Sequence, residues 1–302
     1  MMDFTLFNPI RQLEAIISNI QPKGKFFLPN FDVEKIPTYQ LFFEISSKSF
    51  CFWVKDSVTT QIIWVEEYSL SWLDADSSVV DNISFIYSSH EFLKSIKWHS
   101  IHIQCDSQSF VQVPLPYFRK EFLQKYLQLA KGQLISNSEQ ILSQMDEAYG
   151  LVHVFSVETE LLNWFSQTYP LVEIQYIPVC QILLEVAKAE SRLQPAMYVY
   201  IKEDAINVVV TNNGKLQLCN RFPTRSTNDV LFYILATLSE LSMSPEKAYV
   251  KLFGELGADG QLLAILSEYV TNVELGDYQT VRVWEEGQIP KNYIGMKDCF
   301  TA

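Results

Sequence analysis

The chain has 302 residues, of which 48% are apolar, 19% are charged and 14% are aromatic. Its 35 acidic and 23 basic residues give a net charge of −12, which opposes binding to nucleic acid or to an anionic membrane surface. The apolar fraction excludes a disordered chain. No apolar run reaches the length of about 18 residues that a transmembrane helix needs, so we expect no membrane insertion.

Glycine is scarce: the chain has 10 glycines, about 3% of its residues against roughly 7% in average proteins. Loops that bind phosphate through backbone amides need glycine, because the backbone must approach the anion closely and with positive φ. The composition therefore predicts few such loops.

The N-terminal sequence Met1–Thr5 has neither a basic region nor an apolar core, so we expect no signal peptide. The five cysteines are odd in number, widely spaced and never arranged as CxxC, which favours free thiols over disulfides or zinc ligands. They are Cys51, Cys105, Cys180, Cys219 and Cys299. Together these features predict a cytoplasmic protein.

The first half begins with residues 1–36, which we interpret as an N-terminal extension of unclear role, broken by prolines. Three runs rich in β-branched and aromatic residues then predict a meander of strands, at Tyr39–Ile45, Ser49–Lys55 and Gln61–Tyr68. A helix is expected over Ser89–Lys97, because Phe92 and Ile96 are four residues apart. A strand over Ser100–Gln104 follows it.

The middle of the chain alternates predicted helices and strands. They are the helix Arg119–Leu129, the strand Leu151–Ser156, the helix Glu158–Thr168, the strand Val172–Ile177 and the helix Val179–Ala189. Such alternation favours parallel strand pairing with helices on the faces of the sheet.

The second half repeats the order of the first. A three-strand meander is expected, then a helix capped by Ser226 or Thr227, then a strand and a helix. The ranges are Met197–Lys202, Ala205–Thr211, Lys215–Phe222, Asn228–Leu241, Ala248–Phe253 and Gln261–Tyr269, with a hairpin turn at Asn212-Asn213-Gly214. The sequence therefore predicts a duplicated α/β protein with two mixed sheets flanked by helices, with subdomains at 37–192 and 193–302.

This layout resembles the actin-like ATPase fold, which is built from two ribonuclease H-like halves. Three short motifs are similar to an uncharacterised family from Bacteroidota that is grouped with this fold. They are Phe110–Phe118 followed by Tyr126-Leu127, Leu151–Phe155, and Val250–Leu256. The resemblance covers about Tyr39–Leu275 and extends to cytoplasmic pilus-assembly and type II secretion proteins. Because the family carries no established activity, the resemblance implies the fold more than the function.

Active members of this fold bind nucleotide between their halves, and the first meander turn of each half supplies a phosphate loop, usually Asp-x-Gly followed by small polar residues. In the first half, the resemblance places Glu44 at the acid, Ser46 where glycine is wanted, and Ser47 after it. In the second half, Ile201–Ala205 has neither the acid nor the glycine in place, and its two turn acids would repel phosphate. Two ordinary β-turns are the favoured interpretation.

The adenosine side is better preserved, because Gly254, Gly257 and Gly260 lie between a strand and a helix. A loop that needs left-handed residues, followed by a helix start, is the favoured interpretation of these glycines. If a nucleotide binds, these glycines join Glu44, Ser46 and Ser47 as its site. We expect no cofactor beyond a vestigial ATP and Mg²⁺ site.

Other patterns are weaker. Asp74 and Asp76 are interpreted as solvated loop acids, and His99 and His102 as lying on opposite faces of a strand, so neither pair predicts a metal site. His90 and His153 have no partner nearby in the sequence. The sequence contains no recognisable catalytic motif. A catalytic triad whose residues are scattered along the chain remains an alternative.

Our main hypothesis is a non-catalytic binding or scaffold module whose partner is another protein, with no nucleic acid involved. The alternative is an ATP-binding enzyme, an ATPase or a small-molecule kinase. A third class, a ribonuclease H-like nuclease, would need several acids converging at one sheet. The oligomeric state is not predicted.

Overall fold

The computed structural model describes residues 21–46, 49–70, 78–107, 109–132, 134–202, 204–254 and 261–276. Their contacts divide the chain into two compact units. The first unit holds the described residues up to His102 together with Glu160–Gln175. The second holds Ile103–Thr159 and the described part of Tyr176–Val283.

A six-stranded sheet has the order β1-β4-β3-β2-β5-β9. Its strands are β1 (Gly24–Phe27), β2 (Tyr39–Ile45), β3 (Ser49–Asp56), β4 (Ile62–Ser69), β5 (Ser100–Cys105) and β9 (Ile174–Pro178). Strands β2, β3 and β4 pair antiparallel, which confirms the first predicted meander. Strand β1 lies inside the predicted extension and pairs antiparallel with β4, with Gly24 opposite Glu67.

Aromatic side chains fill the core of the first unit. Phe43 on β2 packs against Phe165 on α4 (Thr159–Thr168), with ring centroids 5.1 Å apart. The Tyr169 hydroxyl, just beyond that helix, donates a hydrogen bond of 3.0 Å to the Leu93 carbonyl. Aromatic rings bury a large apolar area per residue and so stabilise this core. A buried tyrosine hydroxyl needs a hydrogen-bond partner, which the Leu93 carbonyl provides.

The helix predicted over Ser89–Lys97 is wrong. Instead α2 spans Val79–Ser89, and the capping box of Ser78 and Asp81 sets its start. The following residues form no helix: Phe92 and Leu93 are both buried, whereas Ile96 remains exposed. Two apolar residues four apart do not predict a helix when they point to different environments.

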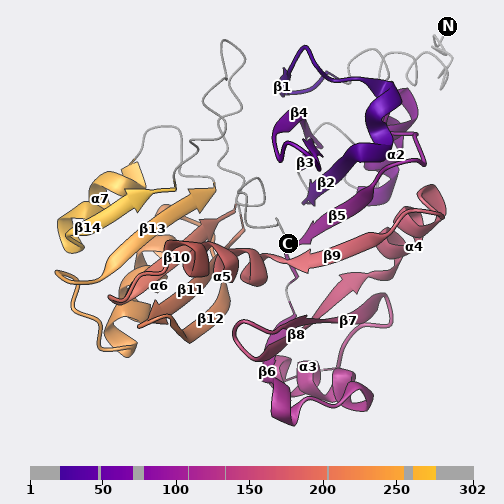
Figure 1. The fold of residues 1–302 in the computed structure, drawn as a ribbon. Helices are drawn as coiled ribbons and strands as arrows, with labels where there is room; N and C mark the ends of the chain where they lie inside the picture. Colours follow the sequence, from indigo (N-terminus) through magenta and orange to yellow (C-terminus); the bar gives the residue numbers. More distant parts are fainter. Residues whose placement is uncertain are drawn as a thin grey trace, which may run out of the picture. The chain divides into compact units, whose positions relative to one another are not determined.

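Among the described residues, the helical segments other than α2 to α7 are the 3₁₀ turns Val33–Thr38, Leu115–Tyr117 and Lys120–Phe122. A separate three-stranded sheet has the order β6-β8-β7, formed by β6 (Phe110–Pro114), β7 (Glu139–Asp146) and β8 (Leu151–Glu158). Helix α3 (Leu123–Lys131) packs against it through Leu127 (Figure 1). The parallel pairing predicted for residues 151–156 is wrong, since β8 pairs antiparallel with both neighbours.

The third sheet has the order β12-β11-β10-β13-β14 (Figure 1). Its strands are β10 (Ala196–Ile201), β11 (Ala205–Asn212), β12 (Lys215–Pro223), β13 (Tyr249–Gly254) and β14 (Asn272–Leu275). The first three form the predicted antiparallel meander, whereas β13 pairs parallel with β10 and with β14. The sheet is therefore mixed, as predicted.

Two sets of helices cover the two faces of this sheet. Helices α6 (Thr227–Glu240) and α7 (Gln261–Tyr269) pack on one core cluster, and α5 (Val179–Glu190) packs on the other. The Ser226 hydroxyl caps α6 by accepting the Asp229 amide, as predicted. Within the described residues, no helix combines the length and apolar character that crossing a membrane requires.

Candidate functional site

The first meander turn is closed by its own serines. The Ser46 amide donates to the Ser49 carbonyl at 2.9 Å, and the Ser46 hydroxyl accepts the Ser49 amide at 3.0 Å. The two hydroxyl oxygens lie 2.8 Å apart. The Ser46 side chain therefore stabilises the turn through its contacts with Ser49. Ser47 lies outside the described residues.

Glu44 occupies β2 opposite Cys51, and only 5% of its surface is exposed. It thus lies two residues before the turn, where the resemblance predicts an acid. A buried site near the end of a strand is where the acid of a phosphate loop would need to lie.

Gly254 ends β13 with φ of 89°, and a Cβ built on it would overlap the carbonyl oxygen of Ile201 on β10. Only glycine fits this backbone and this close approach. Strand packing thus explains Gly254 without a ligand. Gly257 and Gly260 lie outside the described residues.

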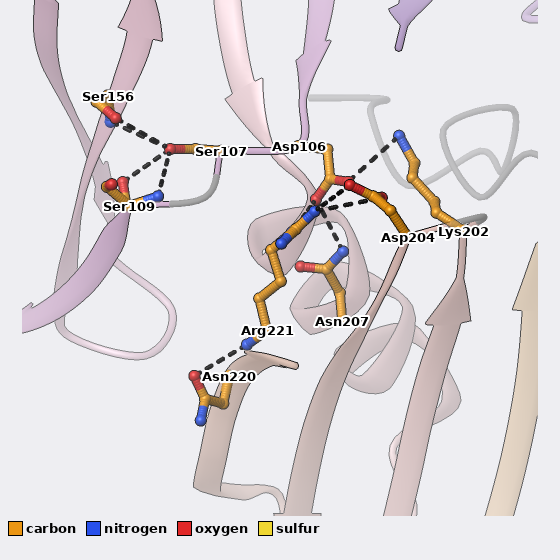
Figure 2. Close-up of polar contacts among 9 residues, drawn as sticks. All are labelled: Asp106, Ser107, Ser109, Ser156, Lys202, Asp204, Asn207, Asn220 and Arg221. Carbon is orange, nitrogen blue, oxygen red and sulfur yellow. Dashed lines mark hydrogen bonds and ion pairs between the residues drawn. The ribbon is translucent and has the colours of Figure 1, made fainter. Parts of the chain in front are cut away.

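The first turn of the second meander joins β10 to β11. Charged side chains from this turn and from neighbouring elements gather around Asp106 (Figure 2). Asp106 follows β5, and its Oδ1 accepts hydrogen bonds from Asn207 Nδ2 at 3.0 Å and from Arg221 Nε at 3.2 Å. Its Oδ2 lies 3.9 Å from Lys202 Nζ. Asp204 adds a second carboxylate, 3.4 Å from Arg221 Nη2. We call Asp106, Lys202, Asn207 and Arg221 the Asp106 cluster.

Burial makes this cluster electrostatically strong. The side chains of Asp106, Lys202 and Arg221 are about one-tenth exposed, whereas that of Asp204 is 69% exposed. Burial alone would raise the pKa of Asp106, but the charges of Lys202 and Arg221 and the hydrogen bond from Asn207 lower it. The buried part therefore holds two cations and one carboxylate.

Ser107 fixes the chain directly after Asp106. Its hydroxyl donates to the Ser109 carbonyl at 2.7 Å and accepts the amides of Ser109 at 3.1 Å and Ser156 at 3.3 Å. Ser156 lies on β8, so these bonds tie the segment after β5 to the three-stranded sheet (Figure 2). These hydrogen bonds hold the backbone directly after Asp106 and so help to position its carboxylate.

Comparison with known proteins places the chain in a family. The model of a protein of unknown function (DUF3822) matches residues 28–273. The chain belongs to the DUF3822 family. The resemblance found in its motifs is confirmed. The comparison with curated proteins finds no match.

Solved structures show the fold of this DUF3822 protein. A Bacteroides thetaiotaomicron protein with an actin-like ATPase fold and unknown function aligns with a TM-score of 0.73 and 21% identity, covering 82% of this chain and 93% of that one. PilM in the PilM–PilN type IV pilus biogenesis complex aligns with a TM-score of 0.54 and 10% identity, covering 80% and 89%. The DUF3822 chain therefore has the actin-like ATPase fold.

Sequence reasoning missed the Asp106 cluster in this DUF3822 protein. It singled out the turn Ile201–Ala205 but not Asp106, Asn207 or Arg221 as partners. An acid directly after a buried strand was the available signal for Asp106. Asp204 was predicted to repel phosphate, but its contact with the Arg221 guanidinium offsets that negative charge.

Two histidines also have partners that their sequence neighbourhood did not predict. His90 Nε2 lies 3.0 Å from Glu66, and His153 lies between Asp146 and Cys180. Both histidines therefore take part in a constellation of side chains, contrary to the expectation from their sequence neighbourhood. Among the described residues, no three His, Cys, Asp or Glu side chains gather to hold a metal ion, and Asp74 and Asp76 lie outside that part.

Proposed function

We propose that this protein is a non-catalytic binding module with an actin-like fold, in which an internal carboxylate takes the place of a nucleotide phosphate at the second phosphate-loop position. The supporting observation is the Asp106 cluster. Arg221 and Asn207 donate to Asp106, and Lys202 lies near it. A phosphate at this turn would have to displace a buried, ionised carboxylate.

The first turn supports the same proposal. There Ser46 binds Ser49 within the turn, and no described glycine frees the backbone for an anion. Of the predicted nucleotide residues, Gly254 is explained by its approach to Ile201. Its conformation needs no nucleotide.

A protein partner fits the surface of the chain. Among the described residues, five large apolar side chains are exposed within the twenty residues from Leu115 to Leu134. They are Leu115, Tyr117, Phe122, Leu129 and Leu134, and Leu129 is 87% exposed. Exposed apolar groups concentrated in one segment favour a protein interaction site. PilM, of the same fold, was solved in complex with PilN, which supports this role.

Calorimetric titration with Mg-ATP tests the proposal. We expect no saturable binding by the wild-type protein. Asp106→Ala should lower stability by about 3 kcal/mol, because it leaves buried cations without their carboxylate. Inorganic phosphate should restore much of that loss by binding Lys202 and Arg221. Asp204→Ala is the matched control: it removes an exposed carboxylate from the same arginine and should cost less than about 1 kcal/mol.

The alternative is an ATPase or small-molecule kinase, favoured by one observation, the buried Glu44 before the first turn. It predicts micromolar, Mg²⁺-dependent ATP binding and turnover that Glu44→Ala abolishes while the variant remains folded. That result would overturn the non-catalytic proposal.

A further inference from the structure

A second buried cluster, within the second unit, joins two cysteines to a histidine and an aspartate. His153 on β8 is fully buried, and its Nε2 lies 3.3 Å from Asp146 Oδ2 on β7. Its Nδ1 lies 3.7 Å from Cys180 Sγ on α5. Asp146 is held in turn by the Tyr149 amide at 3.1 Å. We call Asp146, His153, Cys180 and Cys219 the thiol cluster.

The placement of Cys180 favours its thiolate. Cys180 lies in the first turn of α5, whose N-cap residue Pro178 supplies no side-chain hydrogen bond to the free amides. The positive end of the helix dipole and a neighbouring imidazolium both stabilise a thiolate. The Asp146 carboxylate favours the protonated imidazole, so these contacts favour a thiolate–imidazolium–carboxylate chain.

Electrostatics agree with this geometry. Burial would raise the pKa of Cys180, but hydrogen bonds with Cys219 and His153 lower it. Burial would lower the pKa of His153, but the hydrogen bond to Asp146 raises it. The pKa of Cys219 is raised by burial and by the neighbouring Cys180. These shifts favour ionisation of the Cys180 thiol before that of Cys219.

Cys219 supplies the second sulfur from β12, the edge strand of its sheet. Its sulfur accepts a hydrogen bond of 3.2 Å from Gln112 Nε2, and its side chain packs against the core cluster that contains Val179, the neighbour of Cys180 on α5. The Cys180 sulfur is a neighbouring group. Cys219 is only partly buried, whereas Cys180 is 3% exposed. An edge strand opens more readily than a central one, which gives a small reagent a route to both sulfurs.

We propose that Cys180 and Cys219 form a redox pair, in which hydrogen peroxide closes a disulfide between α5 and β12 and a dithiol reductant reopens it. The Cys180 thiolate attacks one peroxide oxygen, the O–O bond breaks, and the departing hydroxide takes a proton to become water. The Cys219 thiol then loses its proton and attacks the Cys180 sulfenic acid. The S–S bond forms, the S–O bond breaks, and the second hydroxide leaves as water.

The order of contacts, thiol to histidine to carboxylate, also occurs in cysteine hydrolases, but burial argues against that chemistry here. A peptide or ester cannot reach a histidine with no exposed surface and a cysteine that is 3% exposed. Hydrogen peroxide is little larger than water. Disulfides of reducing compartments are typically transient and redox-sensing, which fits a pair that opens and closes.

The test is to treat the reduced full-length protein with hydrogen peroxide and map its disulfides by peptide mass spectrometry. We expect one intramolecular Cys180–Cys219 link, reversed by dithiothreitol. Cys180→Ser and Cys219→Ser should each abolish it, whereas Cys51→Ser, a buried cysteine of the first unit, should retain it. Oxidation that links other cysteines, or no oxidation of this pair in the wild type, would overturn the proposal.

His153→Asn tests the positioning role of the histidine. We expect the ultraviolet absorbance of the thiolate at neutral pH to disappear, and peroxide oxidation to slow at least about tenfold, because the thiol regains its ordinary acidity. Unchanged thiolate absorbance in a folded His153→Asn protein would contradict the role of the imidazolium. The wild-type disulfide map remains decisive even if a variant fails to fold.

Discussion

The buried carboxylate of Glu66 contacts four donors, two from its own strand and two from more distant parts of the sequence. Glu66 on β4 accepts hydrogen bonds from Trp64 Nε1 at 3.1 Å and Lys25 Nζ at 2.8 Å on one oxygen. Its other oxygen contacts the Tyr68 hydroxyl and, at 3.0 Å, His90 Nε2. Such a residue stabilises the fold only while it is ionised.

Glu66→Gln should destabilise the protein by about 3 kcal/mol, because a neutral amide cannot replace a buried carboxylate with four donors. Burial would raise the pKa of Glu66, but bonds from His90, Lys25 and Tyr68 lower it to about 2 from 4.5. The lowered pKa means that its contribution is complete above pH 4.5 and is lost as the pH falls toward 2. Urea unfolding across this range measures both effects.

The control for that experiment is Glu91→Gln, which changes an exposed glutamate. It should leave the stability within about 0.5 kcal/mol of wild type. A Glu66→Gln protein whose stability falls with acid as steeply as wild type between pH 4.5 and 2 would show that other carboxylates account for the dependence.

At the scale of elements, the Asp106 cluster depends on a strand irregularity. Counting outward from the hairpin turn, where Asn212 pairs with Lys215, places Asn207 opposite Asn220. A bulge between Val210 and Thr211 shifts the register, so that Asn207 lies opposite Arg221. A shift of one residue changes which side chains share a face. The sequence predicted both strands and their turn, but it carried no signal for the bulge.

The elements that the sequence predicted are those with strong local patterns. The meanders are rich in β-branched and aromatic residues, and Asn213 and Gly214 adopt positive φ in the predicted turn, at 52° and 69°. Strand β7 was missed because its polar and apolar residues (EQILSQMD) do not alternate as in a half-buried strand, and few of them are buried. Strand β14, with four residues, is too short to show a period.

Gly254→Ala tests the strand contact at the end of β13. The added Cβ would overlap the Ile201 carbonyl, and the backbone has φ of 89°, so we expect a loss of about 3 kcal/mol or more. Gly150→Ala is the matched control, because φ there is 63° and nothing lies within 4 Å of the new Cβ. It should cost only about 1–2 kcal/mol. Equal losses by thermal unfolding would contradict the contact.

At the scale of the whole molecule, the order of elements predicted the fold, because a strand meander, a helix and a strand occur in each half. The chemistry of the turn between β10 and β11 depends on partners from elsewhere in the chain. Asp106 and Arg221 are 115 residues apart, and no local pattern connects them. A duplication can be recognised in a sequence, whereas the contact between Asp106 and Arg221 cannot.

The charge of the whole molecule predicts which partners it rejects. Duplex DNA and anionic vesicles bind proteins through clustered Lys and Arg that release counterions. This chain has 23 such residues against 35 acids, and the buried cations of the Asp106 cluster face a carboxylate. We therefore expect no change in fluorescence anisotropy with labelled DNA, and no cosedimentation with phosphatidylserine vesicles, even at low salt. A lysine-rich protein of similar size is the positive control. Saturable binding that weakens as salt is added would instead reveal a local basic surface and contradict a purely protein-binding role.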